Sequence, residues 1–408
     1  MKKPELLAPA GDIEKLKAAV DYGADAVYFG GGDFSLRSAA RNFDADEMRE
    51  GLDYAHSRGR RCYCAVNVLA RNDEIDRLGD YIRLLCAEGV DAVIVSDLGV
   101  FSVVRSVAPD MDIHISTQAS CMNYASADAW YRLGAKRVIL SREMTMEEIK
   151  RLRRETPDEL DIEAFVHGAM CMSHSGRCLL SNYLTGRDSN GGKCAQPCRW
   201  RYYLMEEKRP GQYFPVEEDS HGTFILNSRD LCMIEHIPEL AGAGITSFKI
   251  EGRMKSPYYT ACVTSAYRRA IDAYAENPEG YVFDRALYDE VCKVSHREYC
   301  TGFYFGDPKG EGQIYATSSY IREWDVVAVV EGYDEKSGMA LLSQRNRFFR
   351  GDTLELMTFG GSAQFRADEL FDGEGEPIDA APHPEMKLKM RLPAAPEPGM
   401  MVRKRRED

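Results

Sequence analysis

The sequence lacks any long apolar run and any familiar nucleotide-binding or protease motif. Within its 408 residues no apolar stretch approaches the roughly 20 residues that cross a bilayer, so we expect a soluble protein. The opening residues MKKPELLAPAGD contain no apolar leader segment, which points to the reducing cytoplasm. The phosphate loop G-x-x-x-x-G-K-S/T, the zinc-protease pattern H-E-x-x-H and the nucleophile elbow G-x-S-x-G are absent. The chain therefore shows none of the patterns typical of the common nucleotide hydrolases, zinc proteases and serine hydrolases.

The sequence also has fewer positively charged than negatively charged residues. The formal net charge is -13, because 65 acidic residues outnumber 52 lysines and arginines. Such a balance argues against broad, non-specific nucleic-acid binding, which depends on many phosphate contacts. It leaves room for a local basic surface, and arginines do gather in places, for example at Arg37 and Arg41. Solvated helix faces explain most such groups, so these arginines alone support only a weak inference.

The cysteines are distributed unevenly along the chain. Four of the 12 form the pattern C-x6-C-x15-C-x3-C at Cys171, Cys178, Cys194 and Cys198, and Cys232 follows. Thiolates at this density, separated by glycines, indicate a soft-metal site. A reducing compartment argues against disulfides, whereas structural zinc is a stronger rival. Zinc ribbons usually carry two C-x2-C pairs, so this spacing favours an iron–sulfur cluster over zinc.

A short phrase recurs in the sequence: a glycine, one or two polar residues, then a β-branched run. It starts at Gly23, Gly89, Gly134 and Gly244, each time after a helix-like amphipathic segment. This phrase is typical of the step from a helix into a buried strand of a βα repeat. Further strands are expected near Leu6, Ala65, Ile115 and Ala164. Eight strands alternating with helices predict a (β/α)8 barrel of the TIM type.

We expect two domains in this α/β protein. The barrel should occupy residues 1–280 and carry the Cys-rich insertion at about 169–245, between its seventh and eighth strands. A linker should follow over 281–312. From 313 to 408, short strands separated by Asp, Gly, Ser and Pro turns predict a small all-β barrel. Such a module resembles the second domains of translation elongation factors, which suits an RNA partner.

The barrel predicts where chemistry takes place, because such enzymes react at the C-terminal ends of their strands. Polar residues occupy the expected strand ends: Asn67, Asp97, Gln118, Arg142, Glu163, His167, Glu251 and Arg253. Any single one could belong to a polar layer of the barrel core without a catalytic role. As a group they favour catalysis. The long insertion follows the seventh strand, so we expect its cysteines at the same C-terminal face of the barrel.

Several sequence blocks together resemble one known family. The block EAFVHGAMCMSHSGRCLLSNYLTGRDSNGGKCAQPCRW, with ELLAPAG, AVYFGG, HISTQ and FKIEGRMKS, is similar to the collagenase-like "peptidase" family of unassigned catalytic type. The resemblance covers essentially the whole chain. Within that family, the YRRAIDAY helix and the C-terminal module look most like the enzymes that hydroxylate wobble uridine of tRNA at carbon five. Other relatives hydroxylate ribosomal RNA or a ubiquinone precursor.

The resemblance implies a 4Fe-4S cluster as cofactor and prephenate, in place of molecular oxygen, as co-substrate. The implied cluster ligands are Cys171, Cys178, Cys194 and Cys198, with Cys232 a fifth thiolate for a site that needs four. Cys171 and Cys178 are the leading candidates. The identity of the other two ligands stays open.

Prephenate is a dicarboxylate, and guanidinium groups bind carboxylates with paired donors. The candidates for this pocket are Arg37, Gln118, Arg142 and Arg253. The candidates for proton transfer are His167, Glu163 and Glu251.

Two other function classes compete with a tRNA hydroxylase. A peptidase needs an activated nucleophile with an oriented base, or a metal-bound water, and the sequence shows neither arrangement. A non-catalytic RNA-binding or assembly subunit is the third class, although a full barrel with a polar mouth favours catalysis. We expect tRNA as the partner, with a paralogous subunit or homo-oligomer left open, and no membrane.

Overall fold

The structure, a computed structural model, describes most of the chain outside the Cys-rich insertion. The described residues are 3–32, 34–35, 42–170, 181, 185, 187, 195, 197, 204–205, 213–214, 218–219, 222–223, 228–308 and 320–406.

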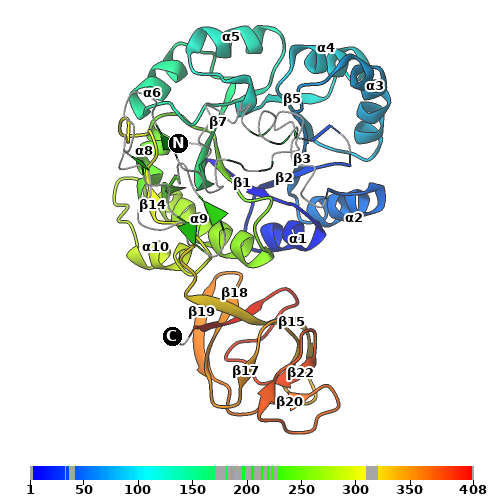
Figure 1. The fold of residues 1–408 in the computed structure, drawn as a ribbon, viewed down its shortest axis with the longest axis vertical. Coiled ribbons are helices and arrows are strands. Elements are labelled where there is room, and N and C mark those ends of the chain that lie inside the picture. Colours follow the sequence, from blue (N-terminus) through cyan, green and yellow to red (C-terminus); the bar gives the residue numbers. More distant parts are fainter. Residues whose placement is uncertain are drawn as a thin grey trace.

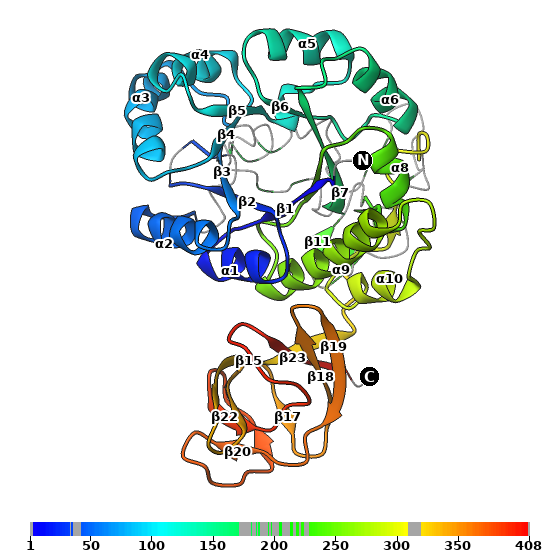
Figure 2. The same cartoon turned by 180° about the vertical axis from the view of Figure 1, so that it is seen from behind.

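The predicted (β/α)8 barrel is confirmed (Figures 1 and 2). Its strands are β1 (Glu5–Pro9), β2 (Ala26–Gly30), β3 (Arg61–Val66), β4 (Ala92–Val95), β5 (Asp112–Ile115), β6 (Arg137–Ile139), β7 (Asp161–Ala169) and β13 (Ser247–Ile250). All eight are parallel, and the ring closes because β13 pairs with both β1 and β7. The strands are buried on both faces, which explains their nearly continuous apolar runs.

Helices surround the barrel. They are α1 (Ile13–Asp21), α2 (Ala45–His56), α3 (Asn72–Ala87), α4 (Leu98–Val107), α5 (Tyr124–Arg132), α6 (Met146–Arg154), α8 (Ile237–Gly242), α9 (Pro257–Glu276) and α10 (Arg285–Val291). Short 3-10 turns lie at η1 (Thr117–Ala119) and η4 (Ile234–His236). None of the helices in the described part of the chain is long and apolar enough to cross a membrane.

Local sequence signals explain where these helices begin and end. Asp44 caps α2 and Thr145 caps α6, each in a reciprocal capping box with the glutamate three residues later. The glycine of each recurring phrase follows a helix with positive φ, from 81° at Gly244 to 104° at Gly134. Glycine adopts this left-handed conformation without steric cost, so the chain reverses there into the next strand.

Two further strands extend the barrel sheet beside β7. β12 (Asp230–Cys232) runs antiparallel to the end of β7, and β14 (Tyr299–Cys300) pairs with β12. Within the insertion, the structure describes the short pairs β8 (Leu204–Met205) with β9 (Tyr213–Phe214) and β10 (Glu218–Asp219) with β11 (Gly222–Thr223). In the stretch expected to be a linker, α10 packs on α9 and β14 joins the sheet, so residues 285–300 belong to the periphery of the barrel.

The C-terminal module is an antiparallel β-sheet domain, as the short strand-like runs predict. The sheet order is β19-β18-β23-β15-β16-β22-β20, and a separate pair joins β17 to β21. The strands are β15 (Trp324–Asp334), β16 (Met339–Gln344), β17 (Phe348–Phe349), β18 (Thr353–Thr358), β19 (Gly361–Arg366), β20 (Phe371–Asp372), β21 (Ala380–Ala381), β22 (Lys387–Met390) and β23 (Met401–Arg405). Across residues 324–405, the ladder contains no pairing that would join the edge strands β19 and β20.

A buried ion pair joins the two domains. Arg403 of β23 is fully buried and donates two hydrogen bonds of 2.7 Å to Glu290 of α10. It also contacts Glu355 of β18, which binds Lys293 at 2.9 Å. Nearby, the Tyr22 hydroxyl at the end of α1 donates to the Met357 carbonyl at 3.1 Å. The module therefore lies against the side of the barrel formed by α1, α9 and α10 (Figure 1).

We expect the ion pair between Glu290 and Arg403 to make the interface between the two domains sensitive to acid. Burial alone would raise the pKa of Glu290, but hydrogen bonds and charge from Arg403 outweigh it and lower the pKa from 4.5 to about 2. Because the folded pKa lies below the unfolded one, this stabilisation is full above pH 4.5 and is lost as the pH falls through about 2. Glu290→Gln should therefore lower the free energy of unfolding by about 3 kcal/mol at neutral pH. It should also make this free energy depend less on pH in the acid range.

Urea unfolding at several pH values measures both effects. The control is Glu235→Gln, which removes only an exposed pair with Arg285 and should cost under about 1 kcal/mol. Equal pH dependence in Glu290→Gln and the wild type would contradict the assignment.

Candidate active site at the barrel mouth

A chain of buried charges crosses the interior of the barrel. Glu163 of β7 accepts hydrogen bonds of 2.8 Å from both Arg137 of β6 and Lys249 of β13. Arg137 also donates to Glu5 of β1 at 2.6 Å, and Ser247 joins the two carboxylates. We call Glu5, Arg137, Glu163 and Lys249 the interior charge network. Its members come from β1, β6, β7 and β13, so it ties together the strands at which the barrel closes.

The network controls the charge state of the barrel interior. Burial would raise the pKa of Glu5, but the Arg137 guanidinium outweighs it and lowers that pKa. Burial lowers the pKa of Lys249 despite the opposing charge of Glu163. Burial, followed by the charges of Arg137 and Lys249, holds the pKa of His114 well below its usual value. His114 is therefore a neutral ring, packed edge-on against Tyr63 at 4.6 Å.

Glu163 does not lie at a strand end, where we expect proton-transfer groups. It is the third residue of the nine-residue strand β7, and its side chain is fully buried between two cations. The expectation misplaces Glu163 because β7 is longer than the other barrel strands and ends only at Ala169. The position of Glu163 is that of a structural counter-ion below the mouth.

Arg142 and Glu251 meet at the mouth, as their positions after β6 and β13 suggest. The guanidinium of Arg142 lies 3.8 Å from the ring centre of Phe165. It donates to the Ala169 carbonyl at 2.7 Å and to Glu251 Oε2 at 3.3 Å. Both side chains are largely but not completely buried, at 13% and 9% exposure. A cation and a carboxylate are thus held side by side with some access from outside.

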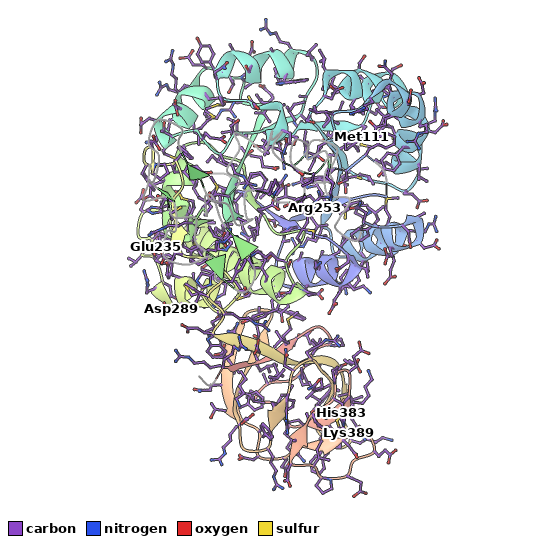
Figure 3. All side chains as sticks on the ribbon, in the orientation of Figure 1. Met111, Glu235, Arg253, Asp289, His383 and Lys389 are labelled. Carbon is purple, nitrogen blue, oxygen red and sulfur yellow. The ribbon has the colours of Figure 1, made fainter. Side chains whose placement is uncertain are left out.

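Arg253 and Gln118 occupy other positions near the strand ends. Arg253 is buried and donates to Ser35 Oγ at 2.9 Å, in the loop after β2 (Figure 3). A side chain at Gly30 would meet the Arg253 guanidinium at 2.5 Å, so this glycine leaves room for the arginine. Gln118 is half-buried in η1, directly after β5, where its backbone N–H donates to Ser116 Oγ.

His167 lies on the outer side of β7 and does not face Arg142. The pairing of β7 with β13 is irregular at this point: Lys249 pairs with Phe165, but the next residue, Ile250, pairs with His167. This bulge turns the imidazole toward α9 and β14, where the rings of Tyr259, Tyr267 and Tyr299 surround it.

The surroundings of His167 do not suit proton transfer at the mouth. Burial, more than the nearby charges of His296 and Lys255, lowers its pKa to about 3. Its Nε2 lies 3.4 Å from the Tyr299 hydroxyl, and its Nδ1 has no hydrogen-bond partner among the described residues. His167 therefore stays neutral at physiological pH inside an aromatic cage.

Most of the expected metal ligands cannot be placed. Cys171, Cys178, Cys194 and Cys198 lie outside the described residues, as does Arg37. Within the described ranges, no group of three or more His, Cys, Asp or Glu side chains is arranged to hold a metal.

Cys232 is the one expected ligand that the described residues include. It ends β12, pairs with His167 and is 6% exposed. Burial raises the pKa of its thiol to about 12. Such a thiol ionises only beside a strong positive charge, which a bound metal supplies. β12 lies between β7 and β14 in the sheet, and its first residue, Asp230, pairs with Ala169, two residues before Cys171 in the sequence. The chemistry of its thiol fits a metal ligand, and the choice of four among five stays open.

Comparison with known proteins identifies the family. Residues 11–314 match peptidase family U32, and residues 322–403 match the peptidase family U32 C-terminal domain. The chain belongs to peptidase family U32. This confirms the family resemblance seen in the sequence blocks. The two matched regions correspond to the barrel and to the C-terminal sheet domain of this U32 chain.

The relatives of this U32 chain include proteins named for tRNA hydroxylation and for hydroxycytidine synthesis in rRNA. It is 41% identical over 406 residues to the tRNA hydroxylation protein P1 of Bacillus subtilis, covering 99% of this chain and 95% of the relative. It is 37% identical over 421 residues to the tRNA hydroxylation protein P of Escherichia coli, covering 94% and 92%. A 23S rRNA 5-hydroxycytidine synthase of Escherichia coli is 34% identical over 272 residues, covering 67% of this chain and 40% of the relative.

The interior charge network of this U32 chain was not apparent as a group in the sequence. Its signal is a charged residue inside an otherwise apolar strand, as with Arg137 in RVIL and Glu5 in ELLAP. A charge at such a position needs a buried partner, but the sequence does not say which of eight strands supplies it.

We expect Glu163→Gln to destabilise the barrel. The substitution leaves Lys249 and Arg137 without their shared carboxylate and should cost about 3 kcal/mol or more of unfolding free energy. Chemical denaturation measures this cost. The control is Glu50→Gln, whose exposed pair with Lys17 should be worth less than about 1 kcal/mol. Unchanged stability together with lost activity would point instead to a proton-transfer role for Glu163.

Proposed function

We propose that this U32 protein hydroxylates RNA. The observation that carries the proposal is the 41% identity, over 99% of this chain, to a protein named for tRNA hydroxylation. The name of the more distant rRNA 5-hydroxycytidine synthase also describes a pyrimidine hydroxylated in RNA. The likeness to the tRNA relatives spans both domains, whereas the match to the rRNA enzyme covers 67% of this chain.

The specific reaction we propose is hydroxylation of wobble uridine in tRNA to 5-hydroxyuridine, with prephenate as co-substrate and without molecular oxygen. Arg142 supports the carboxylate-binding part of this proposal. A guanidinium has five N–H donors, and described partners take only two of them at Arg142. The remaining donors suit a carboxylate, and Arg253 is the second candidate. Glu251, beside Arg142, is our candidate to accept the proton that leaves carbon five of the base.

We further propose a 4Fe-4S cluster on four of Cys171, Cys178, Cys194, Cys198 and Cys232. When bound, such a cluster supplies one-electron transfer or Lewis acidity beside the substrate. The support is the cysteine pattern on the insertion that follows β7, together with the buried position of Cys232 on the neighbouring strand.

Nucleoside analysis tests the reaction. The gene should restore 5-hydroxyuridine to the tRNA of a strain that lacks this modification, in anaerobic as well as aerobic culture. Arg142→Lys should lower the product at least tenfold, because lysine keeps the charge but loses the planar fork, which is worth about 1.5 kcal/mol or more. The control is Arg132→Lys on α5, an exposed arginine paired with Asp128.

Other outcomes of this experiment contradict the proposal. Absence of 5-hydroxyuridine in tRNA, with a new hydroxycytidine in ribosomal RNA or a hydroxylated quinone, would assign the enzyme to another substrate. Peptide cleavage by the purified protein without any modified nucleoside would support a peptidase. Full product in a strain unable to make prephenate would remove prephenate from the mechanism.

Metal analysis tests the cluster. Protein purified without oxygen should contain about four iron and four sulfide per chain, and Cys171→Ser should lose both. The control is Cys86→Ser, an exposed cysteine on α3. Zinc in place of iron in the wild type would overturn the cluster assignment.

A further inference from the structure

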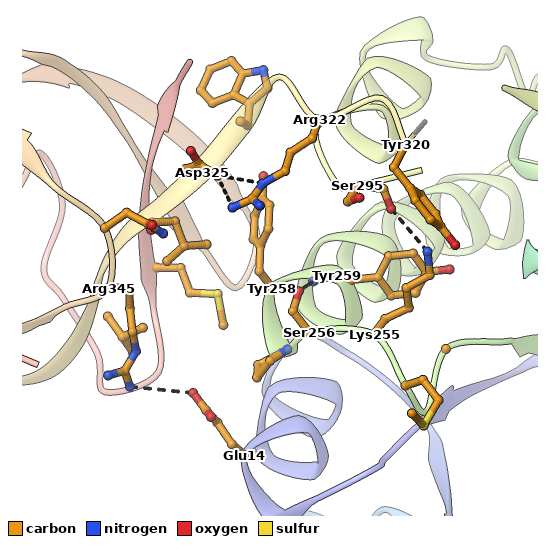
Figure 4. Close-up of a pocket in the computed structure, with 18 of the residues that line it drawn as sticks. Glu14, Lys255, Ser256, Tyr258, Tyr259, Ser295, Tyr320, Arg322, Asp325 and Arg345 are labelled. Atoms are coloured by element: carbon orange, nitrogen blue, oxygen red, sulfur yellow. Dashed lines mark hydrogen bonds and ion pairs between the residues drawn. The ribbon is translucent and has the colours of Figure 1, made fainter. Parts of the chain in front are cut away.

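A cleft separates the mouth of the barrel from the C-terminal module. It has a volume of about 600 Å³ and is lined from both domains (Figure 4). The segment after β13, which includes Glu251 and Lys255, forms one wall. Tyr320 lies beside Lys255, and Arg322 and Arg345 line the cleft from the side of the C-terminal module (Figure 4). Neither domain forms this cleft without the other.

Lys255 brings an unneutralised positive charge into the cleft. Its ammonium reaches the Ser295 carbonyl at 3.5 Å and lies 4.4 Å from the centre of the Tyr320 ring. None of its contacts in the described part of the chain is an ion pair. The three acidic side chains that line the cleft are engaged elsewhere: Asp325 binds Arg322 at 2.5 Å, Glu251 binds Arg142 at 3.3 Å, and Glu14 lies 3.8 Å from Arg345. An anion entering the cleft therefore meets Lys255 as its free counter-charge.

Aromatic surface accompanies this charge. Tyr320 is 38% exposed, and the buried Arg297 lies 4.7 Å from its ring centre. Trp324 lines the same cleft. A cation next to exposed aromatic surface is the combination with which proteins hold single-stranded nucleic acid, because the cation binds phosphate and the ring contacts a base.

The cleft also reaches the candidate active site. Ala169 and Glu251 line it, and these are the two residues that accept hydrogen bonds from Arg142 at the mouth. A molecule in the cleft thus lies directly beside the Arg142–Glu251 pair. An RNA chain continues on both sides of the base that reacts. The nucleotide next to that base therefore needs space beside the active site, and the cleft provides such space.

We propose that this cleft binds a nucleotide adjacent to the target base, with Lys255 on its phosphate and Tyr320 against its base. The inference rests on the proposed RNA hydroxylation and adds to it the part of the protein that holds the RNA. It assigns a substrate-binding role to Lys255 of the barrel and to Tyr320 of the segment that leads into the C-terminal module. The overall charge of -13 fits such a local site better than a broad basic surface.

Binding of a labelled RNA to the full-length protein tests the proposal. The probe is a fluorescein-labelled anticodon stem–loop with uridine at the wobble position, titrated by fluorescence anisotropy at several salt concentrations. Tyr320→Leu should weaken binding about fivefold or more through loss of the aromatic contact. Lys255→Gln should weaken binding and reduce the slope of log affinity against log salt by about 0.7, the value for one phosphate contact on a single strand.

Lys389→Gln is the matched control. Lys389 lies at the far end of the C-terminal module and, like Lys255, forms no ion pair with a described residue (Figure 3). Affinity and salt slope should match the wild type for this variant. Thermal unfolding of each variant shows whether the fold is intact, and Lys255→Gln alone decides the question if Tyr320→Leu does not fold.

The outcomes separate this inference from the proposed function. Wild-type affinity and salt slope in Lys255→Gln, with 5-hydroxyuridine still formed by the wild type, would overturn the cleft assignment and leave RNA hydroxylation standing. Wild-type RNA binding but lost product in Lys255→Gln would place a small anionic co-substrate in the cleft and would also overturn it. Failure of the wild type to modify any RNA would instead overturn the proposed function itself.

Discussion

The carboxylate of Glu163, held between Arg137 and Lys249, is the interaction on which the barrel depends. It lies where β13 closes the ring against β7, and Arg137 extends the chain of charges to Glu5 on β1. Buried ion pairs add little net stability over apolar packing, but loss of one partner is costly. The network therefore acts mainly on register, because a slipped strand would bury an unpaired charge. Correct closure in turn places Arg142 and Glu251 together at the mouth.

Much of the barrel could be predicted from the sequence, because each helix-to-strand step carries its own local signal. The glycine phrases at Gly23, Gly89, Gly134 and Gly244 mark four strands directly, and the remaining strands fill the gaps between them. The meeting of Arg142 and Glu251 follows from the same logic, since the C-terminal ends of neighbouring parallel strands share one face. Glu251 directly follows β13, and Arg142 comes three residues after the end of β6.

Other parts of the site depend on features that a single sequence does not display. The bulge between Phe165 and His167 reverses the side on which the imidazole lies, and a bulge leaves no clear mark in composition. The sequence places Glu163 too near the mouth, because an apolar run shows that a strand is present but not how long it is. The cleft at Lys255 depends on how two domains meet, and the contacts that set this geometry join residues as distant as Glu290 and Arg403.

One short stretch of chain connects the two ends of this arrangement. The hydroxyl of Tyr259 donates to the backbone carbonyl of Glu251 at 3.0 Å, and the neighbouring Tyr258 hydroxyl accepts from Arg403 at 3.2 Å. Lys255 lies between these two anchors. The short segment 251–259 therefore connects Lys255, the carboxylate at the mouth and the interface between the domains. Because this segment is held at both ends, a change in the angle between the domains would act on the position of Glu251 at the mouth.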